Sequence, residues 1–337
     1  MSDATLVSPA NAGKLVSLEE AAALIRSGKV LSIAADAALL EQLPPGNWIG
    51  GTIPYFMAQD GGETTREKVF VTQIDAAAGT PTIRYDDTAE LSRVCVDAPE
   101  SGFSLIILPA FSESHSHFAR DAPSFPDMYM KPLAGWIAGI HLDDLGNDKP
   151  LVFSGNDAKG HEEGAVVMHV TLPPERIAQI GIINLFKQGT GDKIRFTTSG
   201  FSAEGCLING KPTNFAEYVK ANQLDTRLPL VADYCGAMIN VSIKEVDEQA
   251  GRVDFYAPVF DDVEYRIAAP VTDYVEAFRS AAPQQCGQIA FCCNCILNYL
   301  YSELEGKRVE RMFGPMTFGE VAYQLLNQTL VYVTIED

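Results

Sequence analysis

The sequence predicts a mixed α/β fold of two related halves, each with a mixed β-sheet flanked by helices. Three features of the 337-residue chain lead to this prediction. Apolar runs typical of strands buried on both faces alternate with short helical patterns. A unit of strand, helix, glycine turn and strand recurs along the chain. One pair of segments alternates apolar and polar residues, which indicates a half-exposed antiparallel hairpin.

The recurring unit is clearest around Asn47–Phe56, where the apolar sequence NWIGGTIPYF contains two adjacent glycines. We expect a glycine turn here, between a strand at Lys29–Asp36 and a strand at Lys68–Ile74. Two further copies have the same order of strand, glycine turn and strand. They comprise Ser104–Ala110, Met130–Ile140 and Gly164–Val170, and then Gln288–Asn294, Arg311–Val321 and Thr329–Ile335. The repeat predicts an architecture without fixing a chemistry.

The first helices follow from their capping signals. Residues 1–14 are expected to form a flexible arm. Ser17 and Glu20 form a capping box that begins the first helix. Asp36 is placed to cap a second helix, which the pair Pro44–Pro45 ends.

Later elements follow from the same kinds of signal. A helix is predicted near Thr88–Val94, whereas the connection Phe111–Met130 is expected to be a long irregular loop. The alternating hairpin is predicted at Ala237–Asp247 and Arg252–Phe260. Further helices are expected after Thr213, over Thr272–Ala282 and over Ile296–Leu304.

Length and composition set the domain organisation. We expect an N-terminal domain at residues 15–175 and a C-terminal domain at 176–337, because 337 residues exceed the usual size of a single domain. Hydrophobic residues make up 47% and charged residues 20% of the chain, which is enough apolar material for two cores.

The charge balance excludes several classes of partner. A net charge of −19 disfavours nucleic acid and anionic membrane surfaces, which require clustered Lys and Arg. No apolar run reaches the roughly 18 residues of a membrane span, so membrane insertion is not expected. The N-terminus lacks a signal-peptide pattern, and seven cysteines in an uneven distribution are typical of a reducing compartment. We therefore expect a cytoplasmic protein, and an oligomer is compatible with the sequence.

The order of these features resembles the FIST domain family, named for F-box and intracellular signal-transduction proteins. Ile49–Thr52 matches a hydrophobic-Gly-Gly/Cys-Ser/Thr turn of the family's N-terminal half. Leu133–Gly139 and Gly164–Val167 resemble its second glycine turn and its Gly-Ala-Val strand. In the C-terminal half, Cys292–Asn294 and Gly314–Val321 resemble a Cys-Asn element and a glycine turn. The resemblance covers most of the chain.

This resemblance implies a stand-alone sensory module that binds a small molecule, with a signalling protein as a further possible partner. Amino acids are proposed ligands in the family, and some members bind haem. The chain departs from the family at Cys295–Ile296, where relatives have Gly-Arg, and at Pro54–Tyr55, where they have Gly-Glu. If those positions contact ligand in relatives, the ligand here differs or is absent.

The glycine turns and the strand ends supply the candidate ligand contacts. Backbone N–H groups freed by glycine can bind an anion, although glycine also simply permits close packing. Strand ends beside helix starts bind ligands in α/β folds. The predicted pocket lies between or within the halves, with aromatic walls from Trp48, Tyr55, Trp136 and Tyr323. The candidate ligand-binding residues are Gly50, Gly51, Thr52, Trp136, Cys293, Asn294, Gly319 and Glu320.

A metal site is the alternative chemistry. Glu113, His115 and His117 would share one face of an extended chain, and a carboxylate with two imidazoles can hold zinc or iron. The alternative for this run is a solvated polar loop. The cysteines Cys292–Cys295 lack the paired spacing of zinc sites and are more typical of buried small residues.

The function hypothesis is a non-catalytic, cytoplasmic binding protein. Its ligand would be an amino acid or small carboxylate, with haem as a weaker candidate. One alternative is a metal-dependent enzyme that uses Glu113, His115 and His117, and another is a protein-interaction scaffold without a ligand. The sequence requires no cofactor, and it contains no nucleophile elbow, Walker loop or H-E-x-x-H motif.

Overall fold

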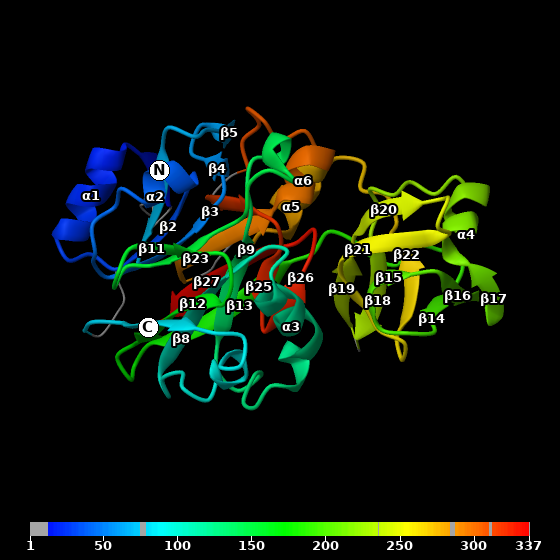
Figure 1. The fold of residues 1–337 in the computed structure, drawn as a ribbon, viewed down its shortest axis with the longest axis horizontal. Helices are drawn as coiled ribbons and strands as arrows, with labels where there is room; N and C mark the ends of the chain where they lie inside the picture. Colours follow the sequence, from blue (N-terminus) through cyan, green and yellow to red (C-terminus); the bar gives the residue numbers. More distant parts are fainter. Residues whose placement is uncertain (1–12, 75–78, 235, 284–286, 310–311, 337) are drawn as a thin grey trace, which may run out of the picture.

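The computed structural model describes residues 13–74, 79–234, 236–283, 287–309 and 312–336. It has a larger body that contains the first and the last described residues and a smaller β-rich body beside it (Figure 1). Several mixed sheets with few helices confirm the predicted mixed α/β class. Most of the predicted arm, and the residues Cys235, Cys286 and Arg311, lie outside the described ranges.

The larger body contains three sheets of six strands each. The first runs β1 (Lys14–Val16), β6 (Val69–Gln73), β2 (Leu31–Ala35), β3 (Trp48–Thr52), β10 (Val152–Ser154) and β11 (Lys159–His161). The second runs β7 (Thr82–Asp86), β12 (Ala165–Thr171), β8 (Gly102–Pro109), β9 (Leu133–Ala138), β25 (Glu320–Ala322) and β26 (Gln324–Leu326). The third runs β13 (Ile177–Ile183), β27 (Leu330–Glu336), β23 (Gln288–Cys295), β24 (Gly314–Thr317), β4 (Tyr55–Ala58) and β5 (Gly61–Thr64).

The three sheets have one topology. In each, two central strands are parallel and a later strand of the same unit pairs antiparallel with the first of them. A helix makes each parallel crossover: α2 (Ala37–Leu40), α3 (Glu113–Asp121) or α6 (Ile296–Tyr301). Another helical segment precedes each first central strand: α1 (Leu18–Arg26), the 3-10 turn η1 (Leu91–Arg93) or α5 (Tyr274–Ala281). The predicted repeat is therefore present, and its three copies correspond to the three units.

The units exchange hairpins in a closed cycle. The hairpin β4–β5 of the first unit pairs with β24 of the third unit. The hairpin β10–β11 of the second unit pairs with β3 of the first. The hairpin β25–β26 of the third unit pairs with β9 of the second. Each sheet is thus completed by a neighbouring unit.

The segments predicted as glycine turns are strands. In each unit the second central strand (β3, β9 or β24) has a glycine next to the first central strand. The space that a side chain would need there is occupied by a backbone carbonyl group of that strand. A Cβ at Gly135 would lie 1.9 Å from the Ile106 carbonyl oxygen. At Gly314 it would lie 2.2 Å from the Cys292 carbonyl, and at Gly50 3.1 Å from the Ile33 carbonyl. Close packing, the alternative reading of these glycines, therefore explains them.

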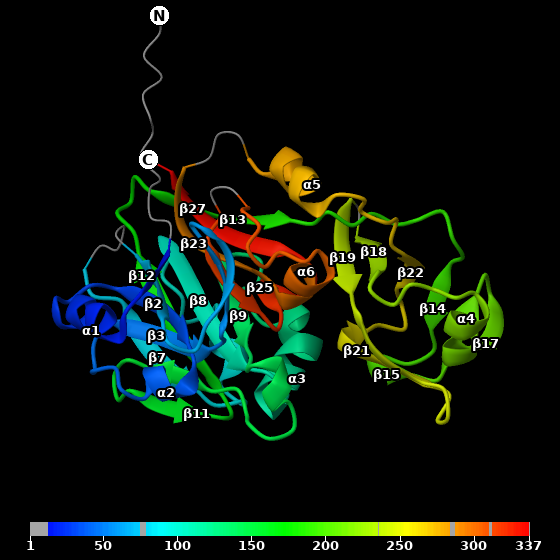
Figure 2. The same cartoon turned by 90° about the horizontal axis from the view of Figure 1, so that it is seen from above.

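The smaller body is an insertion into the third unit, between β13 and α5. One of its sheets runs β17 (Lys211–Asn214), β16 (Gly205–Ile208), β14 (Ile194–Phe196), β22 (Glu264–Ile267), β18 (Leu230–Tyr234) and β19 (Ala237–Val241). The other contains β15 (Gly200–Ala203), β21 (Arg252–Val259) and β20 (Ile243–Asp247), and α4 (Phe215–Ala221) packs against this body. Figure 2 shows it at one end of the molecule. The predicted hairpin is present as β20–β21.

Packing joins the insertion to the second unit. One continuous apolar core contains Phe118 of α3 and Ile106 of β8 together with Phe196 and Phe255 of the insertion.

The division into two domains at residue 175 stays a prediction, but the sheets cross this boundary, because strands of the last unit pair with strands of the first two. No described helix is long and apolar enough to cross a membrane.

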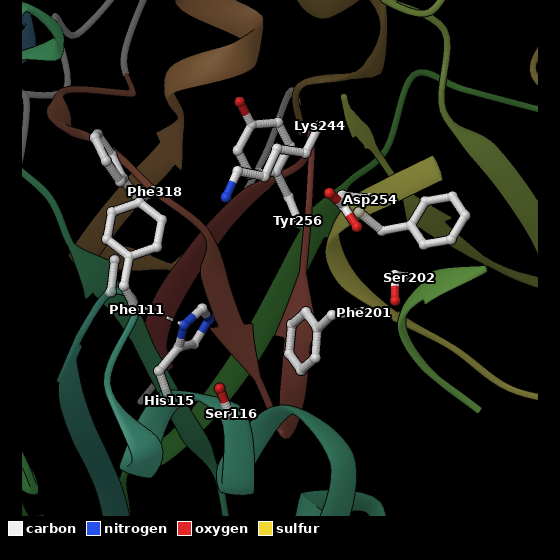
Figure 3. A pocket seen from close by; sticks show the side chains of 11 residues that line it. Phe111, His115, Ser116, Phe201, Ser202, Lys244, Asp254, Tyr256 and Phe318 are labelled. Atoms are coloured by element: carbon white, nitrogen blue, oxygen red, sulfur yellow. Dashed lines mark hydrogen bonds between the residues drawn. The ribbon is translucent and has the colours of Figure 1, made fainter. Parts of the chain in front are cut away.

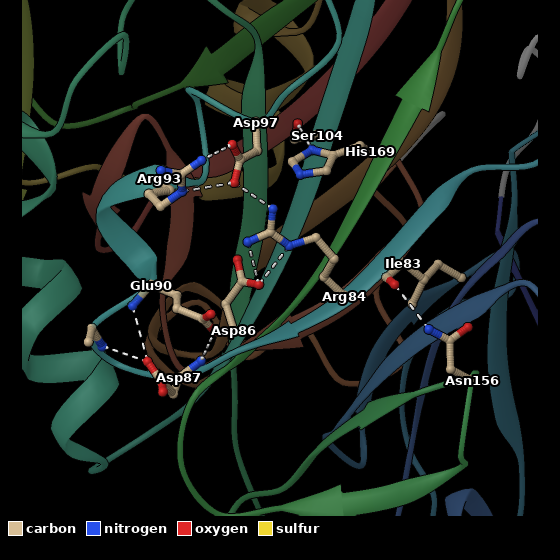
Figure 4. A network of polar contacts seen from close by, with 11 residues as sticks. Ile83, Arg84, Asp86, Asp87, Glu90, Arg93, Asp97, Ser104, Asn156 and His169 are labelled. Carbon is tan, nitrogen blue, oxygen red and sulfur yellow. Dashed lines mark hydrogen bonds and ion pairs between the residues drawn. The ribbon is translucent and has the colours of Figure 1, made fainter.

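The helix predicted near Thr88–Val94 is shorter in the structure, where only the 3-10 turn η1 is helical. An arginine network lies beside this turn. Arg84 donates to Asp86 at 2.9 Å and to Asp97 at 2.6 Å, and Arg93 also donates to Asp97 (Figure 4). Burial raises the pKa of Asp86, whereas hydrogen bonds from Arg93 and Arg84 lower the pKa of Asp97 to about 2. These contacts join β7 to the chain around η1.

Replacing Gly135 with alanine is expected to destabilise the protein by about 3 kcal/mol, because the added Cβ must displace the backbone of β8. Gly191→Ala is the matched control, since nothing lies within 4 Å of a Cβ at that position. Chemical denaturation of both variants measures the difference. Equal free energies of unfolding for Gly135→Ala and Gly191→Ala would contradict this, because they would show that β8 and β9 move apart at little cost.

Candidate functional site

The predicted ligand-binding residues lie together, but they are part of the core. All eight are buried, in the central strands β3, β9 and β23 and around the start of β25. Cys293 Sγ donates to the Gly135 carbonyl at 3.3 Å, and Gly139 N–H donates to the Thr52 carbonyl at 2.7 Å. Glu320 lies opposite Trp136 in the β9–β25 pair. Ligand contact by these residues stays a prediction, and none of them lines the groove described below.

The four aromatic side chains predicted as pocket walls do not line this groove either. Trp48 and Trp136 are buried, and the indole of Trp48 donates to the Pro44 carbonyl at 2.9 Å. The Tyr55 hydroxyl accepts from Leu142 N–H at 3.0 Å. Tyr323 packs against Tyr129, with 5.8 Å between ring centroids.

Glu320 is the most perturbed acid among these residues. Its side chain has no exposed surface, and burial raises its pKa to about 8 despite opposing hydrogen bonds from Thr329. Thr329 donates to Oε2 from its hydroxyl at 2.7 Å and from its backbone N–H at 3.2 Å. The Thr317 hydroxyl lies 3.3 Å from Oε1. Glu320, neutral at pH 7, therefore joins β25 to the end of β24 and to the residue just before β27.

The cysteines of β23 are buried thiols. Burial raises the pKa of Cys292, Cys293 and Cys295 well above the ordinary value of 9.0. All three are free. Asn294 is also internal, because its side-chain oxygen accepts from the Asn298 amide at 2.9 Å. The hypothesis of buried small residues thus accounts for this segment, since a thiolate is needed to bind metal.

The extended chain on which the metal-site alternative was based is absent, because its residues are helical. Glu113, His115 and His117 lie in α3 rather than in an extended loop, so consecutive members point away from each other by about 200°. Ser112 caps this helix by accepting from His115 N–H at 3.0 Å. His117 pairs with Asp121 at 2.8 Å. Among the described residues, no three His, Cys, Asp or Glu side chains are placed to hold a metal.

A groove lies at the carboxyl ends of the central strands of the second and third units, where the larger body meets the insertion. It has two adjoining lobes. The polar lobe, of about 260 Å³, is lined by Ala110, Phe111, His115, Ser116, Phe201, Ser202, Lys244, Asp254, Phe255, Tyr256 and Phe318 (Figure 3). The apolar lobe, of about 300 Å³, is lined by Phe111, Leu142, Leu145, Gly146, Lys244, Tyr256, Ile296, Leu297, Leu300 and Phe318. Strand ends of this kind are where α/β folds bind ligands.

Phe111 stands where the two lobes meet. Its backbone is left-handed, with φ of 68°, which is costly for a bulky side chain. The ring is 54% exposed and meets the edge of Phe318, with 6.1 Å between centroids. Its backbone N–H donates to His115 Nδ1 at 3.4 Å. A strained backbone thus holds a large apolar ring in solvent at the mouth of the groove.

Two further apolar side chains are exposed around the apolar lobe. Leu145 is 46% and Leu300 38% exposed, and they come from the loop after β9 and from α6. Scattered apolar residues on a surface need no explanation, whereas several around one cavity are typical of a binding site. The lobe is therefore apolar both inside and at its rim.

The polar groups of the groove are few. His115 is nearly fully buried, and burial lowers its pKa to about 4, so its ring is neutral at pH 7. Lys244 reaches across the groove, with Nζ 5.4 Å from the centre of the Phe111 ring. Asp254 is held by Arg252 at 3.0 Å. Burial raises the pKa of Tyr256 to about 12, so its phenol keeps its proton.

The N-terminus of α3 already holds an anion of the chain itself. Glu163 accepts from the backbone N–H of Glu113 at 3.1 Å and from that of Ser114 at 3.4 Å. A carboxylate at a helix N-terminus is favourable. A ligand anion in the groove would therefore meet Lys244 and His115 rather than these amides.

Of the candidate site residues predicted from the sequence, His115 lines this groove, but it was predicted for a different role. Ile296, one of the positions where the chain departs from the FIST pattern, lines the apolar lobe. The connection Phe111–Met130 was expected to be a loop, although Ser112 followed by Glu113 is a usable signal for a helix start. Lys244 and Tyr256 were placed correctly in a hairpin, yet nothing in the hairpin pattern indicates what it faces.

Comparison with known proteins identifies the family of the chain. A model of DUF6976, described as a family of unknown function, matches residues 16–336. No curated protein and no solved structure matches the chain. The resemblance to the FIST family stays a prediction.

Replacing Glu320 with glutamine is expected to flatten the pH dependence of stability. Because the pKa of Glu320 is about 8 in the folded chain against an ordinary 4.5, folding takes up a proton between these values. The contribution of this group is complete below pH 4.5 and is lost as pH rises through about 8. Relative to the parent, the variant should gain about 2 kcal/mol between pH 6 and pH 8.

Denaturant unfolding at several pH values measures this gain. Glu67→Gln is the matched control, because Glu67 is exposed. A constant difference between parent and Glu320→Gln across the range would mean that the buried carboxyl is already ionised at pH 6.

Proposed function

The chain belongs to DUF6976, a family of unknown function, and from the geometry of its groove we propose that it binds a small amphipathic molecule. The observation that carries this proposal is the apolar lobe, which is apolar within and rimmed by the exposed side chains of Phe111, Leu145 and Leu300. Cavities of a few hundred Å³ with apolar walls and a few placed polar groups are typical small-molecule sites.

Covering the rim supplies part of the binding free energy. Completing the burial of one leucine-sized side chain contributes about 2 kcal/mol when it is taken fully out of water, and less when it begins half-buried. The three half-exposed side chains around the lobe therefore contribute about 3 kcal/mol together, and burial of the ligand's own apolar surface adds to this. The left-handed backbone at Phe111 supports the same proposal, since strain of this kind gathers at binding sites.

The groove lies between the larger body and the insertion, so ligand binding can affect both. Its walls come from the larger body, through Phe318 and Leu297, and from the insertion, through Lys244 and Tyr256. A bound molecule would therefore touch both bodies at once. A sensory role of the kind that the FIST resemblance implies would follow if that contact alters the surface presented to a partner.

The test uses the uncharged fluorescent probe N-phenylnaphthylamine with the full chain. We expect one saturable site, and Leu300→Asp should weaken binding about tenfold because a charged side chain then faces the apolar lobe. Leu300 is partly exposed, so the substitution leaves the core intact. Fluorescence titration gives the dissociation constants, and thermal melting confirms the fold.

Met130→Asp is the matched control, because Met130 is an exposed apolar side chain that does not line the groove. It should bind the probe as the parent does. Equal binding by all three proteins, or none at saturating probe, would overturn the proposal. Loss of a stable protein complex in Leu300→Asp without any probe binding would favour the interaction-scaffold alternative instead.

A further inference from the structure

We propose that the ligand is an apolar-chain carboxylic acid, with its carboxylate in the polar lobe against Lys244 and His115 and its chain in the apolar lobe. This inference rests on the proposed function and names the class of ligand. It depends on how the two lobes divide polar and apolar groups, on an unpartnered donor in the polar lobe, and on the charge there.

The unpartnered donor is His115. The ring is 7% exposed, and it lies between Phe111 and Phe201 in the close view (Figure 3). Nδ1 accepts the Phe111 N–H, so the proton of the neutral ring is on Nε2. Nε2 is buried and has no hydrogen-bond partner among the described residues. A buried donor without an acceptor is costly, and an oxygen of a ligand in this lobe would satisfy it.

Lys244 supplies the charge. Its amine lies over the Phe111 ring at 5.4 Å from the centroid, at the junction of the two lobes. No ion pair of Lys244 is present in the described part of the chain, whereas the acid that lines the same lobe, Asp254, is held by Arg252. The uncompensated charge of the polar lobe is therefore positive, although the chain as a whole carries −19.

The two lobes adjoin, so that a polar head in one lies next to an apolar chain in the other. They share the side chains of Phe111, Lys244, Tyr256 and Phe318 as walls. Beyond this junction, the apolar lobe is lined by leucine and isoleucine side chains and by Gly146. A charge there would have no partner. The carboxylate must lie at one end of the ligand.

The test compares decanoate, decanol and decylamine, which share one chain and differ in head group. Isothermal titration into the full chain at pH 7.5 should show decanoate binding about tenfold more tightly than decanol, and decylamine most weakly, because only a carboxylate makes charge-assisted bonds to Lys244 and His115. Lys244→Met should remove the preference for decanoate and leave decanol binding unchanged. Lys211→Met, an exposed lysine away from the groove, should change neither.

His115→Gln tests the second contact. It should weaken decanoate binding several-fold with a smaller effect on decanol, provided that thermal melting shows a folded variant. Equal affinities for decanoate and decanol in the parent, unaltered by Lys244→Met, would overturn the carboxylate assignment and leave the apolar groove standing. Tighter binding of decylamine would overturn it as well. Failure of all three compounds to bind would instead count against the proposed function.

Discussion

The close approach of two parallel strands is the constraint on which the molecule depends. In each unit the second central strand places a glycine opposite the first strand, as Gly50, Gly135 and Gly314 do. A side chain there would meet a carbonyl oxygen of the neighbouring strand. This contact recurs in all three units, and after the second central strand of each unit the chain enters another sheet as a hairpin.

The groove follows from where these strands end. The parallel strands of the second and third units finish at Phe111, at Phe318 and at the start of α6, so their connections meet on one side of the molecule. Within the described residues, the insertion occurs in the third unit alone, and its hairpin β20–β21 brings Lys244 and Tyr256 over those connections. The repeated units form one side of the groove, and the insertion forms the opposite side.

Much of this architecture can be predicted from the sequence, because it depends on patterns of neighbouring residues. Buried strands, the caps at Ser17 and Asp36 and the repeated order of elements all follow from neighbouring residues. The glycine segments were misassigned as turns, since glycine serves turns and close-packed strands alike. The groove could not be derived this way. Phe111, Lys244 and Leu300 are far apart in the chain, and only tertiary packing brings them together.

The exchange of hairpins has a consequence for how the chain unfolds. Each unit completes the sheet of one neighbour and is completed by the other, so the cycle has no free end. Deleting any unit would strip a hairpin from one sheet and leave another hairpin with nothing to pair with. The three units therefore cannot behave as separable modules, and the larger body should melt in a single calorimetric transition despite its size.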